Sequence, residues 1–235
     1  MNKVLQLKEF LKNLEKQNHE LLWAKIWDDT RRDIVWLNDL PGISPGRWAV
    51  GYNYIYVMTR ILNTIKPESV LDVGLGISSS LIGAYFSYQN IGSHLIIEQD
   101  AEWVDFYKKD HKLSPFSTIK VLKCVETENG NTKNYSYEGF KSAVGNNIYN
   151  VISIDGPWGS ERHSRRDIVE LLPSILDEEF VIVMDDTNRI GEKDTVDEII
   201  QILNNNNIQT SVGVYPGESE CTVICSERLK FLCSL

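Results

Sequence analysis

The first stretch of the chain carries apolar side chains at a regular helical spacing. Its large aliphatic residues include Val4, Leu7, Leu11, Leu14, Leu21 and Leu22, with lysine and glutamate residues between them. A stripe of this kind is typical of an amphipathic helix, whose apolar face packs against another surface. We therefore expect one or two such helices over residues 3–27. They pack on the rest of the domain or on a second copy in a homodimer, or they form a lid over a substrate site.

A loop and a further helix follow this stretch. Residues 41–53 (PGISPGRWAVGYN) contain two prolines and three glycines, a composition that disfavours regular structure. The sequence then predicts a helix over 54–65, because Pro67 cannot continue a helix and also restricts the residue before it. Residues 1–53 are thus expected to form an N-terminal extension, and the domain itself covers 54–235.

Beyond residue 66, short apolar runs of strand length alternate with segments of helical spacing. The apolar runs cover 69–73, 94–98, 118–125, 149–154, 180–184, 209–215 and 221–225. The helical segments cover 78–88, 101–109, 165–176 and 195–203. This alternation predicts an α/β fold with a doubly wound, Rossmann-like, mostly parallel sheet. The last two strands follow each other directly, so we expect them to form an antiparallel hairpin around 216–219.

Composition narrows the classes of protein that fit this pattern. The 235 residues are 42% hydrophobic and 24% charged, as in an ordinary globular domain. The net charge of −9 disfavours nucleic acid as a partner. No apolar run reaches the about 20 residues of a membrane span, and the charged N-terminus lacks the apolar region of a signal peptide. Because the four cysteines include no C-x-x-C pair, we expect a cytoplasmic protein with free thiols.

The segment LDVGLGISSS at 71–80 places a glycine turn between the first predicted strand and the helix after it. In open α/β sheets, ligands bind at the carboxyl ends of the strands, where the winding reverses. Glycines let backbone N–H groups approach a ligand closely, and a serine can cap the following helix. The candidate ligand-binding residues of this segment are Asp72, Gly74, Leu75, Gly76, Ser78 and Ser79.

Two acidic residues distinguish between the ligands that such a loop can bind. A dinucleotide site has the pattern G-x-G-x-x-G, whereas the last glycine is replaced here by Ser79. S-adenosylmethionine has no pyrophosphate but carries an ammonium group, which Asp72 can hold directly or through water. Glu98 ends the next strand, where a carboxylate can accept both ribose hydroxyl protons. The sequence therefore favours S-adenosylmethionine over a nicotinamide cofactor.

The segment 72–78, followed by Glu98, resembles motifs I and II of class I S-adenosylmethionine-dependent methyltransferases. The resemblance extends over residues 66–226. It implies a sheet of seven strands in the order 3-2-1-4-5-7-6, with strand 7 antiparallel. Many members of the class carry a third glycine where this chain has Ser78, and other members tolerate the difference.

Three further carboxylates stand at the ends of the fourth and fifth predicted strands. Asp155 follows the fourth strand, and Asp185 and Asp186 follow the fifth. Neighbouring strands lie about 5 Å apart, so these side chains can converge, and Asp155 and Asp185 are candidate catalytic residues. The set can also bind Mg²⁺ or Mn²⁺, as in the metal-dependent O-methyltransferases of catechol and macrocin type, which it resembles. In the alternative, Asp155 is a plain base and Asp186 caps the next turn.

A second resemblance concerns the methyl acceptor. The segments DGPWG at 155–159 and VIVMDDTNR at 181–189 are similar to glucuronoxylan 4-O-methyltransferases and related bacterial polysaccharide methyltransferases. This resemblance implies a sugar hydroxyl as acceptor. Tryptophan rings can stack on a sugar, and arginines can bind its carboxylate or phosphate groups. The candidate substrate-binding residues are Trp48, Trp158, Arg162, Arg165 and Arg166. His163 competes with Asp155 as the candidate base.

Three other functions stay open. A methyltransferase acting on the nitrogen or oxygen of a small, non-sugar acceptor can use the same fold. A non-catalytic S-adenosylmethionine-binding protein is the second alternative, although it would be expected to have lost its strand-end carboxylates. A nicotinamide-dependent oxidoreductase is the third. No Asn-Pro-Pro-Tyr type motif follows the fourth predicted strand, so methylation of a nucleobase is disfavoured.

Overall fold

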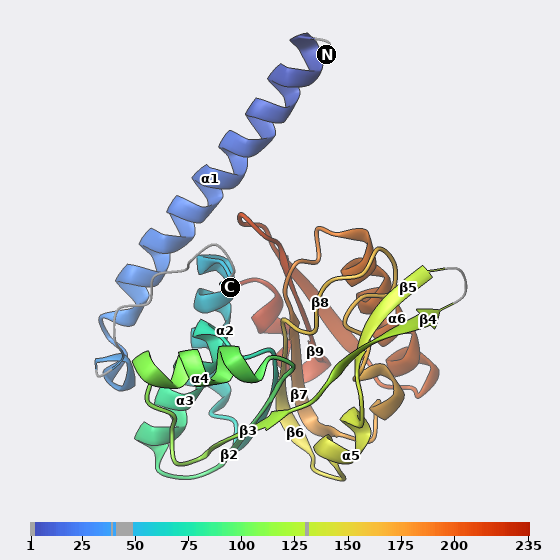
Figure 1. Ribbon diagram of the computed structural model, residues 1–235. Helices are drawn as coiled ribbons and strands as arrows, with labels where there is room; N and C mark the ends of the chain where they lie inside the picture. Colours follow the sequence, from blue (N-terminus) through green and yellow to red (C-terminus); the bar gives the residue numbers. More distant parts are fainter. Residues whose placement is uncertain (1–2, 39, 41–48, 130–131) are drawn as a thin grey trace.

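The computed structural model describes residues 3–38, 40, 49–129 and 132–235. Their central sheet has seven strands in the order β3-β2-β1-β6-β7-β9-β8 (Figure 1). These strands are β1 (Ser69–Val73), β2 (Ser93–Glu98), β3 (Ser117–Val121), β6 (Tyr149–Ile154), β7 (Leu176–Met184), β8 (Thr210–Tyr215) and β9 (Cys221–Ser226). Strand β9 runs antiparallel to β7 and β8, and the other neighbours pair in parallel. The sheet order and the C-terminal hairpin expected from the sequence are thus confirmed.

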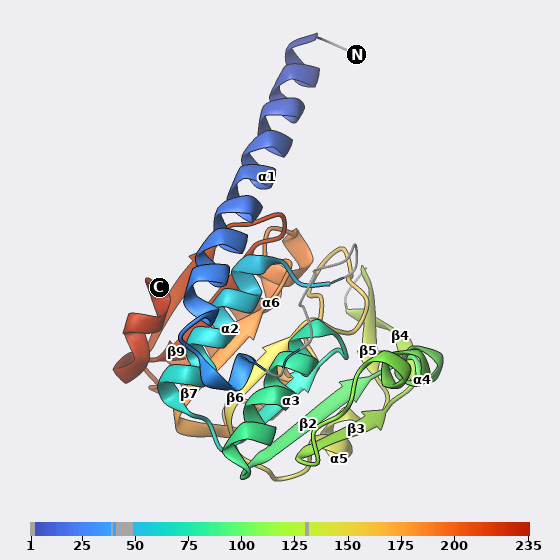
Figure 2. The same ribbon diagram turned by 90° about the vertical axis from the view of Figure 1, so that its left-hand side faces the viewer.

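Helices cover both faces of this sheet (Figure 2). The α-helices are α1 (Lys3–Arg31), α2 (Tyr52–Ile65), α3 (Ile77–Gln89), α4 (Ala101–Asp110), α5 (Phe140–Val144) and α6 (Ile190–Asn205). The 3₁₀-helices are η1 (Val35–Leu37), η2 (Val169–Leu171) and η3 (Glu227–Cys233). Side chains of α2 and α3 form one hydrophobic cluster with the sheet, and side chains of α5 and α6 form another. The sheet is therefore the middle of three layers.

Successive residues of a strand belong to opposite clusters. Val70 packs on the α2–α3 side and Leu71 on the α5–α6 side, and both are fully buried. Their partners on β6, Val151 and Ile152, repeat the pattern. Burial on both faces explains why these strands read as continuous apolar runs rather than as alternating ones. It also brings the carboxyl ends of the parallel strands together along one edge of the sheet.

Helix α1 lies only partly on this body. Near its C-terminal end, the Trp27 Nε1–H donates to the Thr59 hydroxyl of α2 at 3.2 Å, and the Trp23 ring packs on Tyr56. Its N-terminal half extends away from the sheet (Figures 1 and 2). The amphipathic helix expected near the N-terminus is thus confirmed, and its role stays a prediction. In the described part of the chain, none of the helices has the length and apolarity needed to cross a membrane.

The prediction of one strand over 118–125 is wrong. The chain leaves the sheet after β3 and forms a separate hairpin of β4 (Cys124–Asn129) and β5 (Thr132–Tyr137). This hairpin is fastened to the loop after β6, because the Tyr135 N–H donates to the Ser160 hydroxyl at 3.1 Å and the Tyr137 N–H donates to Asp167 at 2.7 Å. The dipeptide Gly-Asn at 130–131, between the two strands, is the sequence signal that could have located it.

The predicted helix over 165–176 is also wrong. This segment contains the short η2, and the residues before it include left-handed backbone at His163 (φ 48°) and Arg165 (φ 55°). A helix through Arg165 would need a right-handed conformation at that residue. Other boundaries shift by a few residues, because α2 begins at Tyr52, β7 at Leu176 and α6 at Ile190.

Candidate functional site

The sheet order reverses between β1 and β6, where two backbone turns pass each other closely. Gly74, directly after β1, has a φ of +110°, and a Cβ there would lie 3.0 Å from the carbonyl carbon of Asp155. A Cβ at Gly156 would lie 3.2 Å from the Gly74 Cα and 2.6 Å from the Tyr137 hydroxyl. Position 74 therefore requires glycine, and a side chain at Gly156 would need its neighbours to shift. We call the residues around the turns at Gly74 and Gly156 the switch-point site, because α/β sheets bind ligands where the strand order reverses.

Asp72 supports the glycine turn from within the sheet. It lies one residue before the end of β1 and is fully buried. Its carboxylate accepts from the Ser79 hydroxyl at 2.6 Å and from the Ser153 hydroxyl at 2.7 Å. Ser79 in turn accepts from the Gly76 N–H at 3.1 Å, and the Tyr54 hydroxyl lies 2.7 Å from Ser153. Asp72 thus fixes the shape of the turn, and its direct contact with an ammonium group stays a prediction.

Glu98 joins the end of β2 to the same turn. One carboxylate oxygen accepts from the Leu75 N–H at 2.9 Å, and the other accepts from the N–H groups of Gln99 at 2.7 Å and Asp100 at 2.9 Å. Burial raises the pKa of Glu98, and these three hydrogen bonds lower it in part. Because a carboxylate offers about four acceptor positions, Glu98 retains acceptor capacity for a ligand hydroxyl.

The glycine turn leaves room for a ligand at Gly76. A Cβ at Gly76 would meet no atom within 4 Å, although the next residue begins α3 and Ser78 in its first turn is buried. Beside the turn, the Trp103 Nε1–H donates to the Leu75 carbonyl at 2.8 Å, and Trp103 as a whole is 40% exposed. Open space, a carboxylate at the end of β2 and an exposed ring fit a nucleoside with free hydroxyl groups. The residues present therefore fit S-adenosylmethionine.

The carboxylates after β6 and β7 converge as the sequence predicted. One oxygen from each of Asp155, Asp185 and Asp186 lies within 4.8 Å of the others. The Ser219 hydroxyl donates to Asp185 at 2.9 Å. Asp186 has left-handed backbone (φ 63°) and is bonded to Arg189 at 2.9 Å. The geometry thus gathers the three acidic candidates of the sequence on one side of the site.

Arg165 already supplies a cation to this acidic group. Its guanidinium lies 3.0 Å from an Asp155 oxygen and 2.8 Å from an Asp186 oxygen, and the residue is 6% exposed. It also donates to the carbonyl of Asp185 at 3.3 Å and lies 3.8 Å from Glu192. A divalent ion bound by these carboxylates would have to displace the guanidinium or be repelled by its positive charge at close range. The residues, arranged in this way, do not fit Mg²⁺ or Mn²⁺.

Burial makes two of these carboxylates stronger bases than ordinary ones. It raises the pKa of Asp155 well above the usual range, while Arg165 lowers that pKa and the nearby acidic side chains raise it. Burial and the Asp186 charge raise the pKa of Asp185 to about 6. A carboxylate with a raised pKa is a candidate general base at neutral pH. Asp155 is the more accessible of the two, because 24% of its side chain is exposed and the whole Asp185 residue is 3% exposed.

The basic candidates on the loop after β6 point in two different directions. Arg162 binds the Asp194 carboxylate of α6 with two nitrogens, and Arg166 binds Glu198 of α6 at 2.5 Å. The His163 Nδ1 lies 3.7 Å from Glu198. These three side chains thus fasten the loop to α6, whereas Arg165 turns inward to Asp155. Their roles in substrate binding and, for His163, as a base stay predictions.

Aromatic rings mark the rim of the site. Trp158 is 56% exposed and packs edge-on against Tyr135 of β5, with ring centroids 5.6 Å apart. Sequence reasoning missed Tyr135, because the hairpin that carries it was not predicted. Trp48, the other predicted stacking residue, lies outside the described residues.

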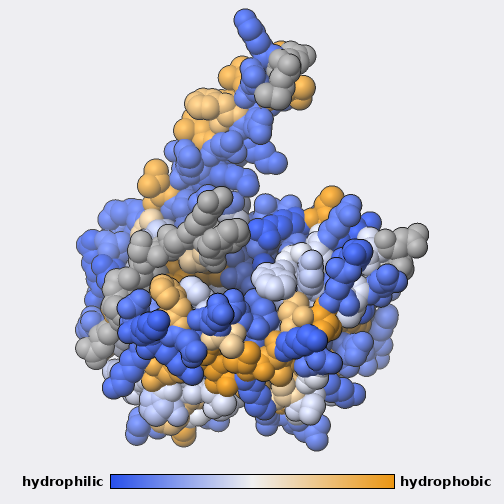
Figure 3. Space-filling view, in the orientation of Figure 1, coloured by the Kyte–Doolittle hydropathy of each residue, from blue (hydrophilic) through white to orange (hydrophobic). Residues whose placement is uncertain are grey.

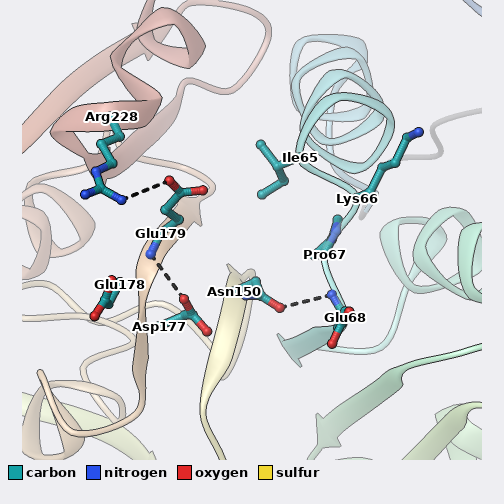
Figure 4. Close-up of a pocket in the computed structure, with 9 residues that line it drawn as sticks. All are labelled: Ile65, Lys66, Pro67, Glu68, Asn150, Asp177, Glu178, Glu179 and Arg228. Carbon is teal, nitrogen blue, oxygen red and sulfur yellow. Dashed lines mark hydrogen bonds and ion pairs between the residues drawn. The ribbon is translucent and has the colours of Figure 1, made fainter.

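A separate hollow lies at the opposite end of the strands. It has a volume of about 360 Å³ and is lined by residues that precede or begin β1, β6 and β7 (Figure 4). Among them, Glu179 is paired with Arg228 at 3.5 Å, and Asn150 accepts from the Glu68 N–H at 3.0 Å. None of the predicted site residues within the described part of the chain lines this hollow, so these candidates stay with the switch-point site.

Comparison with solved structures connects this geometry to known proteins. A candidate caffeoyl-CoA O-methyltransferase from Staphylococcus aureus is 11% identical, with a TM-score of 0.52 over 88% of this chain and 100% of that chain. A precorrin-6y C5,15-methyltransferase from Geobacter metallireducens is 14% identical, with a TM-score of 0.52 over 79% and 93%. The O-methyltransferase TomG from Streptomyces achromogenes, solved with S-adenosylmethionine, is 11% identical, with a TM-score of 0.50 over 83% and 85%.

Neither family models nor curated protein sequences give a match. Identities this low carry information about the fold and not about the substrate. The likeness concerns the fold as a whole, which in this chain comprises the seven-stranded sheet with an antiparallel hairpin at its edge. The chain therefore has the Rossmann-like fold that these methyltransferases share.

Proposed function

We propose that the protein is an S-adenosylmethionine-dependent O-methyltransferase that methylates a hydroxyl group of a sugar or a polysaccharide precursor. One observation carries the proposal: the glycine turn after β1 lies directly against the turn that bears Asp155. The place for a methyl donor and a carboxylate that can take a proton are therefore neighbours. The shared fold supports the same class of reaction.

The chain's first task is to hold the methyl donor. When bound, S-adenosylmethionine supplies a methyl group on a positively charged sulfur. Glu98 accepts hydrogen bonds from the ribose hydroxyls, Gly76 leaves the space, and Asp72 keeps the turn in shape. Four carboxylates face two guanidinium groups around Asp155, and this excess of negative charge favours a cationic ligand.

The second task is to take the acceptor's proton. Asp155 would accept the hydroxyl proton of the acceptor while the acceptor oxygen takes the methyl group that a bound S-adenosylmethionine would supply. Asp155 suits this role because its carboxylate is partly exposed at the end of β6 and its pKa is raised by burial. Arg165 holds the same carboxylate in one orientation through its 3.0 Å contact. Orientation of this kind is a large part of catalysis.

The third task is to position the acceptor. A sugar ring presents an apolar face of C–H groups, which exposed aromatic rings bind by stacking. Trp158 and Tyr135 offer such a surface beside Asp155. Because Arg162 and Arg166 are paired with α6, we propose that the rings, and not these arginines, make the main contact with the acceptor.

The proposed reaction needs no divalent metal. The positive charge that a metal would place among Asp155, Asp185 and Asp186 is supplied by Arg165. An arginine is charged at all physiological pH values and binds carboxylates with defined geometry. No step of the proposed mechanism is therefore assigned to a metal ion.

The direct test is methyl transfer from a labelled donor to a panel of glycans, nucleotide sugars and non-sugar alcohols. Asp155→Asn should lower turnover by about 10²- to 10⁴-fold, as expected for loss of a general base, and leave donor binding within a few fold by calorimetry. Glu98→Gln should weaken donor binding, whereas Glu102→Gln on the exposed side of α4 serves as the matched control.

Three results would count against the proposal or part of it. Binding of NAD without binding of S-adenosylmethionine would remove the methyltransferase assignment altogether. Transfer confined to small non-sugar acceptors would retain that assignment and replace the sugar by the alternative acceptor class. Donor binding without transfer to any acceptor, at wild-type Asp155, would favour a non-catalytic binding protein.

A further inference from the structure

Helix α1 presents an apolar face that the body of the protein does not cover. The large apolar side chains of this face are between 42% and 70% exposed: Leu7, Phe10, Leu11, Leu14, Leu21 and Leu22. The space-filling view shows apolar side chains along the arm where it projects from the body (Figure 3). A surface of this kind on an extended element marks a place where another molecule binds.

The spacing of this face is that of a coiled coil. Leu7, Leu11, Leu14, Asn18 and Leu21 follow one another at intervals of four, three, four and three residues. This is a heptad pattern with alternating a and d positions, in which Asn18 takes one a position. A repeat of 3.5 residues keeps one face turned toward a partner helix along its whole length. The pattern therefore indicates a helical partner and not a flat surface.

The described residues of the body do not provide that partner helix. Among them, the hydrogen bonds between α1 and the body begin at Glu20, which accepts from the Tyr52 N–H at 2.8 Å, and continue through Trp23 and Trp27 toward the C-terminus. The preceding residues of α1 extend beyond the sheet in both views (Figures 1 and 2). None of the described helices of the body lies along this part of α1, so a helix of another chain is the candidate partner.

A second copy of this chain provides enough surface. Burying a large apolar side chain removes on the order of 100 Å² from water, so the six of this face offer on the order of 600 Å². Stable protein interfaces bury about 600–1,000 Å² on each partner. Two copies of α1 therefore reach the lower end of that range without any contribution from the bodies.

Charge favours an antiparallel pair. With Leu11 opposite Leu14 of the partner, the flanking Lys8 of each helix faces Glu15 of the other, which gives two pairs of opposite charge. A parallel pair would match Asn18 with its counterpart but would set Lys3 against the partner's Lys8. We propose that α1 forms an antiparallel coiled coil with α1 of a second copy, so that the protein is a homodimer joined by its N-terminal arms.

The oligomeric state of the full chain tests this proposal. Sedimentation at micromolar concentration should give twice the monomer mass for the wild type and the monomer mass for Leu7→Glu/Leu14→Glu. The control Gln6→Glu/Asn13→Glu adds the same charge to the same turns on the opposite face and should remain a dimer. All of these positions are exposed, so unchanged circular dichroism and thermal unfolding of the body should confirm that each variant folds.

A monomeric wild type, or a Leu7→Glu/Leu14→Glu variant that stays dimeric, would overturn the dimer. A monomer whose α1 binds anionic lipid vesicles would instead assign the face to a membrane surface. For the orientation, Lys8→Glu should weaken the dimer at least severalfold, and Lys8→Glu/Glu15→Lys should restore it. Strengthening by Lys8→Glu would overturn the antiparallel arrangement, because it would relieve the contact with Lys3 in a parallel pair. These readouts do not depend on the proposed enzymatic activity.

Discussion

Asp155 and Arg165 lie 3.0 Å apart at the end of β6, with Asp186 on the other side of the guanidinium at 2.8 Å. Removal of Arg165 would leave the carboxylates facing one another without a cation between them. Each carboxylate would then be harder to ionise, because like charges at this distance repel and burial strengthens the repulsion. The protonation state of Asp155 is thus set by a neighbour that is ten residues away in the sequence.

Arg165→Met should move the acid limb of the activity profile to higher pH. Arg165 lowers the pKa of Asp155, whereas burial raises it, so loss of the guanidinium leaves only influences that raise it. If Asp155 must be ionised to accept a proton, turnover rises with pH, and in the variant this rise should occur at a higher pH. The check is kcat/KM against pH for both proteins. Arg162→Met, which removes an arginine paired with Asp194 instead, should leave the limb in place.

Treatment with a metal chelator should leave turnover unchanged within a factor of about two. Arg165 already neutralises part of the acidic group, so removal of divalent ions takes no charge away from Asp155. Turnover measured before and after chelation, and again after Mg²⁺ or Mn²⁺ is restored, is the test. A loss on chelation that either ion reverses would show that a metal acts in place of, or together with, the guanidinium.

At the scale of elements, the turn between β1 and α3 joins stability to ligand binding. Gly74 faces the backbone of Asp155 at a left-handed φ, whereas Gly76 is extended and faces open space. The two glycines are thus required for different reasons. The first permits two chain segments to pass, and the second leaves room for what binds between them.

Gly74→Ala and Gly76→Ala should therefore affect different properties, the first the stability of the fold and the second the binding of the donor. Gly74→Ala should lower the free energy of unfolding by at least about 1–2 kcal/mol, since alanine is strained at positive φ and its Cβ would press on the Asp155 carbonyl. Gly76→Ala should change the free energy of unfolding by no more than about 0.5–1 kcal/mol, chiefly through the entropy of the unfolded chain. It should, however, weaken donor binding. Urea unfolding and calorimetric titration of both variants separate the two effects. Equal donor affinity for Gly76→Ala and the wild type would place the ligand elsewhere.

The elements that the sequence predicted well are those that depend on local patterning. The sheet strands such as β1, β6 and β9 are apolar runs bounded by turns, so their pattern was sufficient. The β4–β5 hairpin is polar on both strands and gave no such pattern. The inward turn of Arg165 depends on partners after β7, and the pairing of Arg162 with Asp194 spans 32 residues. Contacts over that distance in sequence are not encoded in local periodicity.

At the scale of the whole molecule, the layers explain why the acidic side chains meet. The helices on both faces bury the parallel strands, so Asp72, Glu98, Asp155 and Asp185 are carried to one edge by four different strands or the turns after them. The sequence was sufficient to predict this gathering, because strand order and direction fix which ends are neighbours. It was not sufficient to predict which charges compensate one another there.

The bound methyl donor should stabilise the whole domain. A ligand that binds the folded state at about 100 times its Kd adds about 2.7 kcal/mol, and a domain of this size gains about 2–4 °C per kcal/mol, so Tm should rise by about 5–10 °C. Differential scanning calorimetry with S-adenosylmethionine measures the shift, with NAD at the same concentration as the control. A shift with NAD alone would contradict the cofactor assignment.

The polar hairpin of β4 and β5 is inserted between β3 and α5, outside the main sheet, and it brings Tyr135 to the rim beside Trp158. The proposed donor side of the site, in contrast, is formed by residues of β1 and β2 and the turn between β1 and α3. In the proposed enzyme, changes in the β4–β5 hairpin could therefore exchange one acceptor for another during evolution. The part of the site formed by β1 and β2, which is proposed to bind the donor, would stay unchanged.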